Sequence, residues 1–168
     1  MIVNAIGYPV SNYAISIASG KAYTGTKNVS TDNSGQFDEV TIYEGALQIS
    51  SMSKPRSIIS GIELAAGQDL FLTLVVDHGD YEIMGRIIDG GGQAISDAQV
   101  KLSWNHTSDG LNSSSVHLLK SDASGNYRFQ NVGPGLHTLS VAAEGYKNAR
   151  QDIISEQQIG PLTITLNR

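Results

Sequence analysis

The chain has 168 residues, of which 40% are apolar and 16% are charged, and this length suits one mid-sized domain or two small ones. The formal net charge is −5, with 11 Lys and Arg outnumbered by 16 Asp and Glu, and the basic face of a nucleic-acid-binding protein is not apparent. The chain lacks cysteine, which excludes disulfides, thiol catalysis and cysteine-ligated metal sites.

The first residues, Met1–Gly7, have neither the positive region nor the apolar region of a signal peptide. They resemble the middle of a strand, so we expect Met1 to be a cloning start and the chain to be cut from a longer one. The stretch Ser57–Ala66 hints at a helix, but its β-branched residues and the following Gly67 favour a strand and a loop. The longest apolar run, Leu70–Val76, is strand-sized and far shorter than the roughly 20 residues that span a bilayer.

Apolar and polar residues alternate in many short segments, which places each apolar set on one face of a strand. These sets are Val100, Leu102 and Trp104; Tyr127 and Phe129; Leu139, Val141 and Ala143; and Leu162, Ile164 and Leu166. Glycine-rich turn signals separate them, at 89–92, 122–125, 133–135 and 144–145. Such spacing predicts an all-β sandwich or barrel.

The two halves of the chain match each other. Residues 2–17 lie over residues 87–102 at an offset of 85, and residues 31–76 lie over residues 121–166 at an offset of 90. Aspartate, glycine and apolar positions coincide within both blocks without gaps. The offsets differ by five, so the second half carries five extra residues, which we place within Ser103–Leu119.

The match predicts two tandem Ig/prealbumin-like, seven-stranded antiparallel β-sandwiches. The first covers residues 1–78, with its opening strand truncated, and the second covers residues 79–168. A module this small buries only about 60–65% of its unfolded surface, which leaves no volume for a deep active site.

The second half resembles the carboxypeptidase regulatory-like domain, a transthyretin-like or Cna-B-like β-sandwich. The segment Gly85–Leu102 is similar to the family pattern G-x-V-x-D-x-x-G-x-P-I-x-x-A-x-V, and Ser121–Phe129 to T-D-x-x-G-x-Y-x-F. The segment Asn131–Tyr146 is similar to V-x-P-G-x-Y-x-L-x-V-x-A-x-G-Y, with His137 in place of the usual Tyr. Ala94 stands where Pro is usual. The first half then resembles a diverged copy.

The motif residues suit a scaffold. Asp122 can accept backbone N–H groups across a turn that Gly125 closes, and Pro134-Gly135 can turn the chain between two strands. We therefore expect these residues to support folding and not catalysis, and we expect no enzymatic activity and no cofactor.

Three alternative sites are weak in this sequence. Some Cna-B domains contain an intramolecular isopeptide bond, but here Lys101 is predicted to point outward and no acid lies between it and Asn167 on the strand 138–142. The four histidines, at positions 78, 106, 117 and 137, lack the spacing of metal ligands. The segment Asp32–Gly35 faintly resembles a calcium loop, but a turn is the better interpretation because Asp122–Gly125 repeats it.

The segment Trp104–Ser115 is the best candidate for ligand binding, because it combines an aromatic ring with amides and hydroxyls that suit a sugar. The residues that we single out are Trp104, Asn105, His106 and Asn112. The simpler alternative, which we favour, is a solvated hairpin in which Trp104 is buried in phase with Val100 and Leu102.

These observations predict a non-catalytic spacer or interaction module of a larger secreted or cell-surface protein. The expected partners are other domains of the parent protein and a glycan or protein ligand, without nucleic acid or membrane insertion. The alternative is a carbohydrate-binding accessory module of a polysaccharide-active enzyme.

Overall fold

The structure is a computed structural model that describes residues 1–20, 25–52, 55–157 and 160–168. In these ranges the regular elements are β-strands and one short 3-10 helix, so the all-β fold class is confirmed. The chain separates into two compact units. Unit 1 consists of residues 1–78 and 105–115, and unit 2 consists of residues 79–104 and 116–168.

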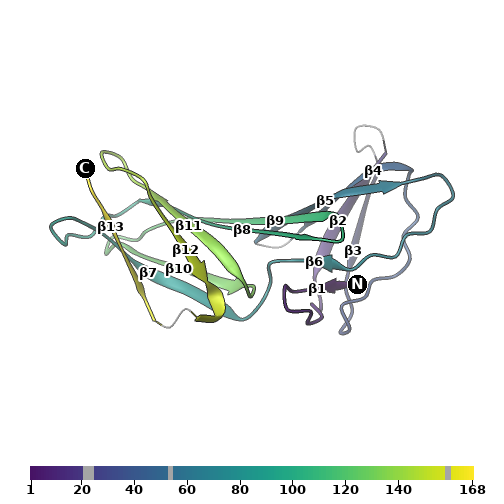
Figure 1. The fold of residues 1–168 in the computed structure, drawn as a ribbon, viewed down its shortest axis with the longest axis horizontal. Coiled ribbons are helices and arrows are strands. Elements are labelled where there is room, and N and C mark those ends of the chain that lie inside the picture. The colour runs from purple at the N-terminus through teal and green to yellow at the C-terminus, as the bar shows by residue number, and fades with distance from the viewer. Residues whose placement is uncertain (21–24, 53–54, 158–159) are drawn as a thin grey trace. The chain divides into compact units, whose positions relative to one another are not determined.

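Unit 1 is built from six strands of the first half and from parts of two strands of the second half. The six are β1 (Ile2–Val3), β2 (Ala14–Ser19), β3 (Gly25–Ser30), β4 (Gly45–Ser51), β5 (Arg56–Leu64) and β6 (Leu74–Val75). Residues 105–108 of β8 (Gln99–Ser108) and residues 111–115 of β9 (Leu111–Lys120) also belong to this unit. The hydrogen-bonded order of its main sheet is β9-β5-β4-β2-β3, and β1 pairs with β6 in parallel (Figure 1).

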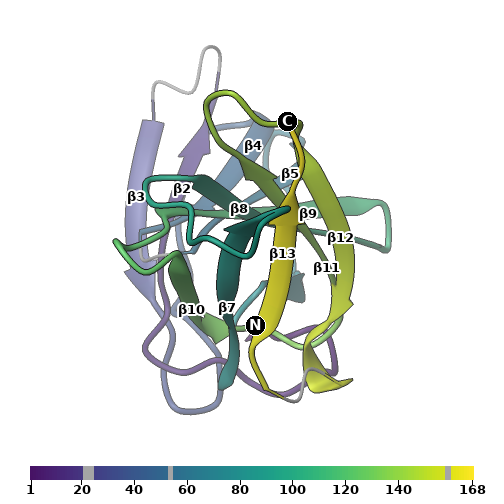
Figure 2. The ribbon, with the colours of Figure 1, turned by 90° about the vertical axis from the view of Figure 1, so that its left-hand side faces the viewer.

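Unit 2 has two sheets that face each other. Its other strands are β7 (Tyr81–Asp89), β8 (Gln99–Ser108), β10 (Asn126–Val132), β11 (Leu136–Ala142), β12 (Ala149–Ile154) and β13 (Leu162–Leu166), and the 3-10 helix η2 (Ser155–Gln157) follows β12. One sheet has the order β10-β7-β13 and the other has the order β12-β11-β8-β9. Figure 2 shows β10, β7 and β13 in front of the second sheet.

Each unit has its own apolar core, which the alternation of its strands produces. Most of the predicted inward residues are buried in the core of unit 2: Val100, Leu102, Tyr127, Phe129, Leu139, Val141, Ile164 and Leu166. Trp104 is buried as well, whereas Ala143 and Leu162 are only partly buried against this core. The core of unit 1 is formed by Ile2, Val10, Tyr13, Ile15, Ile17, Leu47, Ile49, Ile59, Ile62, Leu74 and Val76. Between the inward residues of β8, Lys101 is exposed, as predicted.

Two segments of the first half show how far the strands predicted from the sequence extend. The stretch Ser57–Ala66 forms the strand β5 as far as Leu64, followed by a turn, so the interpretation as a strand and a loop is confirmed. The apolar run Leu70–Val76 forms a strand only at Leu74–Val75, and the side chain of Phe71 is 95% exposed. Leu74 and Val76 are buried in the core, so the inward phase extends over only part of the run.

Candidate functional site

The aspartate turns of the two units make the same hydrogen bonds. In unit 2, Asp122 Oδ1 accepts the backbone N–H groups of Ser124 and Asn126, each at 2.8 Å. In unit 1, Asp32 Oδ1 accepts those of Ser34 and Gln36, at 2.8 and 2.9 Å. The carboxylate oxygens therefore organise turns, as predicted for both positions, and the interpretation of Asp32–Gly35 as a turn is confirmed.

A second pair of turns lies at the start of each unit. Asp89 Oδ1 accepts the N–H groups of Gly91 and Gln93, both at 2.9 Å. Asn4 occupies the corresponding place in unit 1, and its Oδ1 accepts the N–H of Tyr8 at 3.0 Å. Because an amide oxygen replaces a carboxylate oxygen here, the turn requires an acceptor of hydrogen bonds and not a charge.

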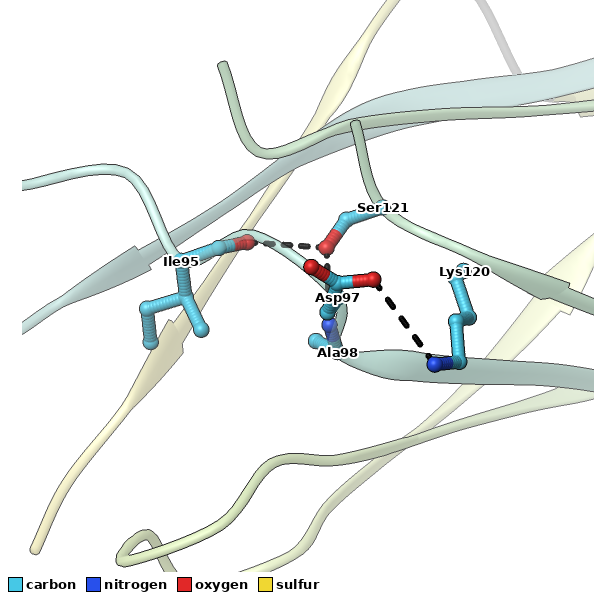
Figure 3. A network of polar contacts seen from close by, with 5 residues as sticks. All are labelled: Ile95, Asp97, Ala98, Lys120 and Ser121. Atoms are coloured by element: carbon cyan, nitrogen blue, oxygen red, sulfur yellow. Dashed lines mark hydrogen bonds and ion pairs between the residues drawn. The ribbon is translucent and has the colours of Figure 1, made fainter. Parts of the chain in front are cut away.

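A buried hydroxyl ties together the strands beside each aspartate turn. The hydroxyl of Ser121 donates to the carbonyl of Ile95 at 2.8 Å and accepts the N–H of Ala98 at 3.0 Å (Figure 3). In unit 1, the Thr31 hydroxyl donates to Val10 O at 2.6 Å and accepts the N–H of Tyr13 at 2.9 Å. Both hydroxyls are buried with both bonds made, so they are inaccessible to a substrate.

The glycines that close the aspartate turns lie against backbone. Gly125 has φ +78°, and a Cβ there would collide with the carbonyl oxygen of Ile87. Gly35 has φ +70°, and a Cβ there would lie 2.5 Å from the carbonyl oxygen of Ile2. The backbone N–H of Ile87 donates to Gly125 O at 2.8 Å, and that of Ile2 donates to Gly35 O at 2.7 Å. These glycines therefore permit close backbone approach.

The electrostatics of unit 2 reflect structural hydrogen bonds. The backbone N–H of Asn126, helped by its side-chain amide, holds the pKa of Asp122 below its usual range. A hydrogen bond from Arg128, at 2.6 Å, lowers the pKa of Glu82. Burial raises the pKa of Tyr127 to about 12, and within the described residues its hydroxyl makes no hydrogen bond. The shifts favour the ionised carboxylates of Asp122 and Glu82 and the neutral phenol of Tyr127.

A third corner of unit 2 surrounds Ser155 in η2. Its hydroxyl donates to Gly133 O at 2.8 Å, and its backbone N–H donates to Gly135 O at 3.1 Å. The Glu156 carboxylate accepts the N–H of Gly135 at 2.8 Å, and Nδ1 of the buried His137 lies 3.0 Å from Gly135 O. The corner thus contains a serine, a histidine and an acid. The Ser155 hydroxyl also lies 3.0 Å from the Glu156 carboxylate, and each of the three side chains contacts a backbone group of the turn at 133–135.

Unit 1 contains a buried polar cluster that includes one residue of the second half of the sequence. Asp77 is fully buried and accepts a hydrogen bond from the hydroxyl of Ser115, which is 2% exposed. Nearby, Tyr13 packs edge-to-face against His78, with ring centroids 5.5 Å apart, and its hydroxyl lies 3.4 Å from Ser57 Oγ. Burial raises the pKa of the Tyr13 phenol, and the charge of Asp77 adds to the rise.

The segment Trp104–Ser115 is a hairpin formed by β8 and β9. Asp109 and Gly110 connect the strands, with φ values of 51° and 77°, as a two-residue turn of type I′ requires. Thr107 Oγ1 donates to Asn112 Oδ1 at 3.0 Å within the hairpin. The Asp-Gly dipeptide was the signal that could have predicted this hairpin and its length.

The predicted ligand-binding residues do not form one surface. The Trp104 side chain is 2% exposed, so the interpretation of its ring as part of the interior is confirmed, and the ring presents no open face to a sugar. Asn105 and Asn112 are exposed and His106 is half-buried. Trp104 and His106 alternate with Asn105 along β8, so His106 and Asn105 lie on opposite faces of the strand.

The described ranges also contain the residues considered for a metal site and for an isopeptide bond. Within them, no three His, Asp or Glu side chains lie close enough to hold a metal ion. Lys101 lies opposite Ser140 on β11, and Asn167 follows β13 and accepts the backbone N–H of Lys147 at 2.8 Å through its carbonyl. No helix among the described residues is long and apolar enough to cross a membrane.

The family model for the carboxypeptidase regulatory-like domain matches residues 82–167 of the 168 in this chain. The chain therefore belongs to the carboxypeptidase regulatory-like domain family. The matched residues include the turns at Asp89 and Asp122 and the corner at Gly133–Gly135 described above. No curated protein matches the chain.

Solved structures with some likeness include two streptococcal pilins and a protein of Bacillus anthracis. A streptococcal ancillary pilin is 12% identical, with a TM-score of 0.42, over 100% of this chain and 60% of its own. The minor pilin GBS52 of Streptococcus agalactiae is 12% identical, with a TM-score of 0.41, over 96% of this chain and 85% of its own. The Bacillus anthracis TIE protein is 17% identical, with a TM-score of 0.38, over 100% of this chain and 32% of its own. This chain thus spans less than two thirds of the first and third of these proteins.

Proposed function

We propose that units 1 and 2 are two copies of one module, and that the pair is a non-catalytic spacer and interaction element of a larger secreted or cell-surface protein. The duplication is supported by the matched bonds of the turns and hydroxyls in the two units. It is also supported by the strands that open and close each unit. Ile2 pairs with Leu74 in unit 1, and Ile87 pairs with Ile164 in unit 2, at the offsets of 85 and 90 seen in the sequence.

The non-catalytic role is supported by what the motif residues do. The hydroxyls of Thr31 and Ser121 are buried, and each makes two hydrogen bonds to backbone groups. The carboxylates of Asp32 and Asp122 accept backbone N–H groups of their own turns. A nucleophilic hydroxyl must be accessible and must have a base within hydrogen-bond reach, and the hydroxyls of Thr31 and Ser121 are buried and bonded to backbone groups. The polar residues of the motif are therefore engaged in folding.

The spacer role rests on one observation: residues 105–115 belong to unit 1, although their neighbours on both sides belong to unit 2. The chain therefore passes from one unit to the other after residues 78, 104 and 115. Three covalent connections restrict relative motion much more than one linker would. Leu111 packs against the core of unit 1, and Ser115 donates to Asp77, so the hairpin end is held on that unit.

The test is a distance distribution between the units. Because the chain has no cysteine, spin labels can be attached to cysteines introduced at two exposed turns, by Asn33→Cys in unit 1 and Glu144→Cys in unit 2. Double electron–electron resonance should give one narrow distribution. Removal of Thr107, Ser108, Leu111 and Asn112 leaves the Asp109-Gly110 turn in a shorter hairpin. This deletion should broaden the distance distribution.

Two controls make this test specific. Replacing Thr107, Leu111 and Asn112 by serine keeps the hairpin length and removes the Leu111 contact, so it should broaden the distribution less than the deletion. Circular dichroism of each variant must retain the β-sheet signal. A broad distribution in the unaltered chain would contradict the spacer role.

A further inference from the structure

Strand β5 of unit 1 has both of its edges paired. One edge pairs with β4 and the other with β9. The inward side chains of β5, among them Ser57 and Ile59, are 1% and 2% exposed. A Cβ on Gly61 would lie 2.8 Å from the carbonyl oxygen of Gly110, so the hairpin turn packs closely on this strand. Residues of β9 thus complete the unit 1 sheet as an added strand.

Strand β12 of unit 2 corresponds to β5 in the proposed duplication, because both follow the middle strand of their sheet as antiparallel partners. Among the described residues, however, β12 pairs only with β11 and ends its sheet. Its residues Arg150, Gln151 and Asp152 are exposed. An edge of this kind presents unpaired backbone N–H and C=O groups to any chain that can pair with it.

The inward face of β12 is also incompletely covered. Gln151 lies opposite the buried Leu139, and paired residues of antiparallel strands point to the same face, so Gln151 has the inward phase and is nevertheless exposed. A groove of about 190 Å³ lies beside it, lined by residues that include Leu139, Val141, Ala149 and Ile164. An added strand would place alternate side chains over this groove.

We propose that β12 is an acceptor edge for the long β8–β9-type hairpin of a further module of this family, which would add to unit 2 as Leu111–Ser115 adds to unit 1. The shape of the occupant follows from the residues that β5 receives. Leu111 is partly buried against the core of unit 1, and Ser113 and Ser115, which follow at alternate positions, are buried. The partner is thus a hairpin end with small or apolar residues at alternate positions.

The unit 1 hairpin β2–β3 does not suit this role. It lacks the five extra residues of the β8–β9 hairpin, and its edge strand β3 has only six residues, with Lys27 exposed in its middle. The acceptor edge therefore selects the long form of the hairpin. This inference rests on the proposed duplication. It deepens the proposed role by naming the kind of partner that the edge of β12 would bind.

The test uses the intact chain and a labelled peptide of residues 103–116, closed into a ring by cysteines added at its two ends. Fluorescence anisotropy should show saturable binding with a Kd of about 1 mM or tighter. In amide NMR spectra the shifts should move at Ala149–Ile154. The change Gln151→Lys, which places a charge at the inward edge position, should weaken binding at least about tenfold. The control Gln93→Lys, at an exposed turn residue, should leave binding unchanged.

Three results would overturn the inference. They are absence of binding at millimolar peptide, shifts confined to β5 or β3, and equal binding by a peptide in which Leu111 is replaced by Asp. The distance measurement proposed for the spacer role does not involve β12. A narrow distance distribution together with unchanged amide shifts in β12 would therefore reject the acceptor edge and leave the proposed spacer role standing.

Discussion

The turns of unit 1 and unit 2 differ in several side chains and share their hydrogen bonds. Thr31 in one unit and Ser121 in the other each bind a carbonyl and an N–H of the segment before them. Asn4 and Asp89 likewise fill one role with different groups. The fold therefore requires a hydrogen-bond acceptor at a fixed place, whereas the charge and size of the residue that supplies it can change.

The core shows a larger difference at one position. Leu47 of unit 1 and His137 of unit 2 correspond at the offset of 90, and both are buried. The leucine belongs to an apolar cluster, whereas His137 Nδ1 lies 3.0 Å from Gly135 O in the corner that Ser155 organises. At this position unit 1 thus has an apolar contact, whereas unit 2 has a polar corner.

The largest effect should come from the glycines that touch backbone. Gly125→Ala should cost about 3 kcal/mol of unfolding free energy, because the new Cβ collides with Ile87 O at a positive φ. Gly92→Ala should cost only about 1 kcal/mol, because its φ is +84° but its Cβ would meet nothing within 4 Å. Urea unfolding followed by the fluorescence of Trp104 measures both.

The same pair of changes in unit 1 tests whether the two units follow one plan. Gly35→Ala should be much more destabilising than Gly7→Ala, which has φ +85° and open space around it. Calorimetry of the intact chain measures both changes. Equal losses of stability from Gly35→Ala and Gly7→Ala would show that the two units do not follow one plan.

The next effect should come from the buried hydroxyls. Ser121→Ala should lower the unfolding free energy by about 2 kcal/mol, because it leaves the N–H of Ala98 and the carbonyl of Ile95 without their partner. Thr31→Val should cost a similar amount in unit 1. Ser124→Ala, at an exposed position of the same turn as Ser121, is the control and should change stability by less than about 0.5 kcal/mol.

A smaller effect should appear in the pH dependence of unit 2. The folded-state pKa of Asp122 is lowered by the hydrogen bond from Asn126 N–H. Its stabilisation is therefore present above the unfolded pKa of about 3.9 and is lost as the pH falls through the folded value. Asp122→Asn should flatten the acid limb of a stability profile measured by urea unfolding from pH 7 to pH 2. An unchanged acid limb would show that this carboxylate contributes nothing to the turn.

The smallest effect concerns the phenol of Tyr127. Its pKa is raised to about 12 by burial, so the unfolded state ionises first and stability is lost as the pH rises above about 10. Tyr127→Phe should remove the alkaline loss and should raise stability at pH 7 by less than about 1 kcal/mol, because no described group bonds to the hydroxyl. A marked loss of stability at pH 7 would reveal a partner for this hydroxyl.

Much of this architecture could be predicted from the sequence, because it is local. Turns at Asp32 and Asp122 are specified by an acceptor and a glycine three residues later, and the inward phase of Val100, Leu102 and Trp104 follows from period two. The assignment of residues 105–115 to unit 1 could not be predicted, because no local pattern specifies which unit a strand end pairs with. Ser115 and Asp77 are 38 positions apart, and neither residue type indicates the other as its partner.

Native-state hydrogen exchange in the Gly35→Ala variant tests most directly whether the hairpin end is part of unit 1. The substitution destabilises unit 1 at a turn that lies far along the chain from the hairpin. We expect the amides of residues 111–115 to lose protection together with those of β5. The amides of residues 116–120 should remain as protected as the other strands of unit 2. If residues 111–115 instead remain as protected as residues 116–120, the hairpin end belongs to unit 2 and the account is contradicted.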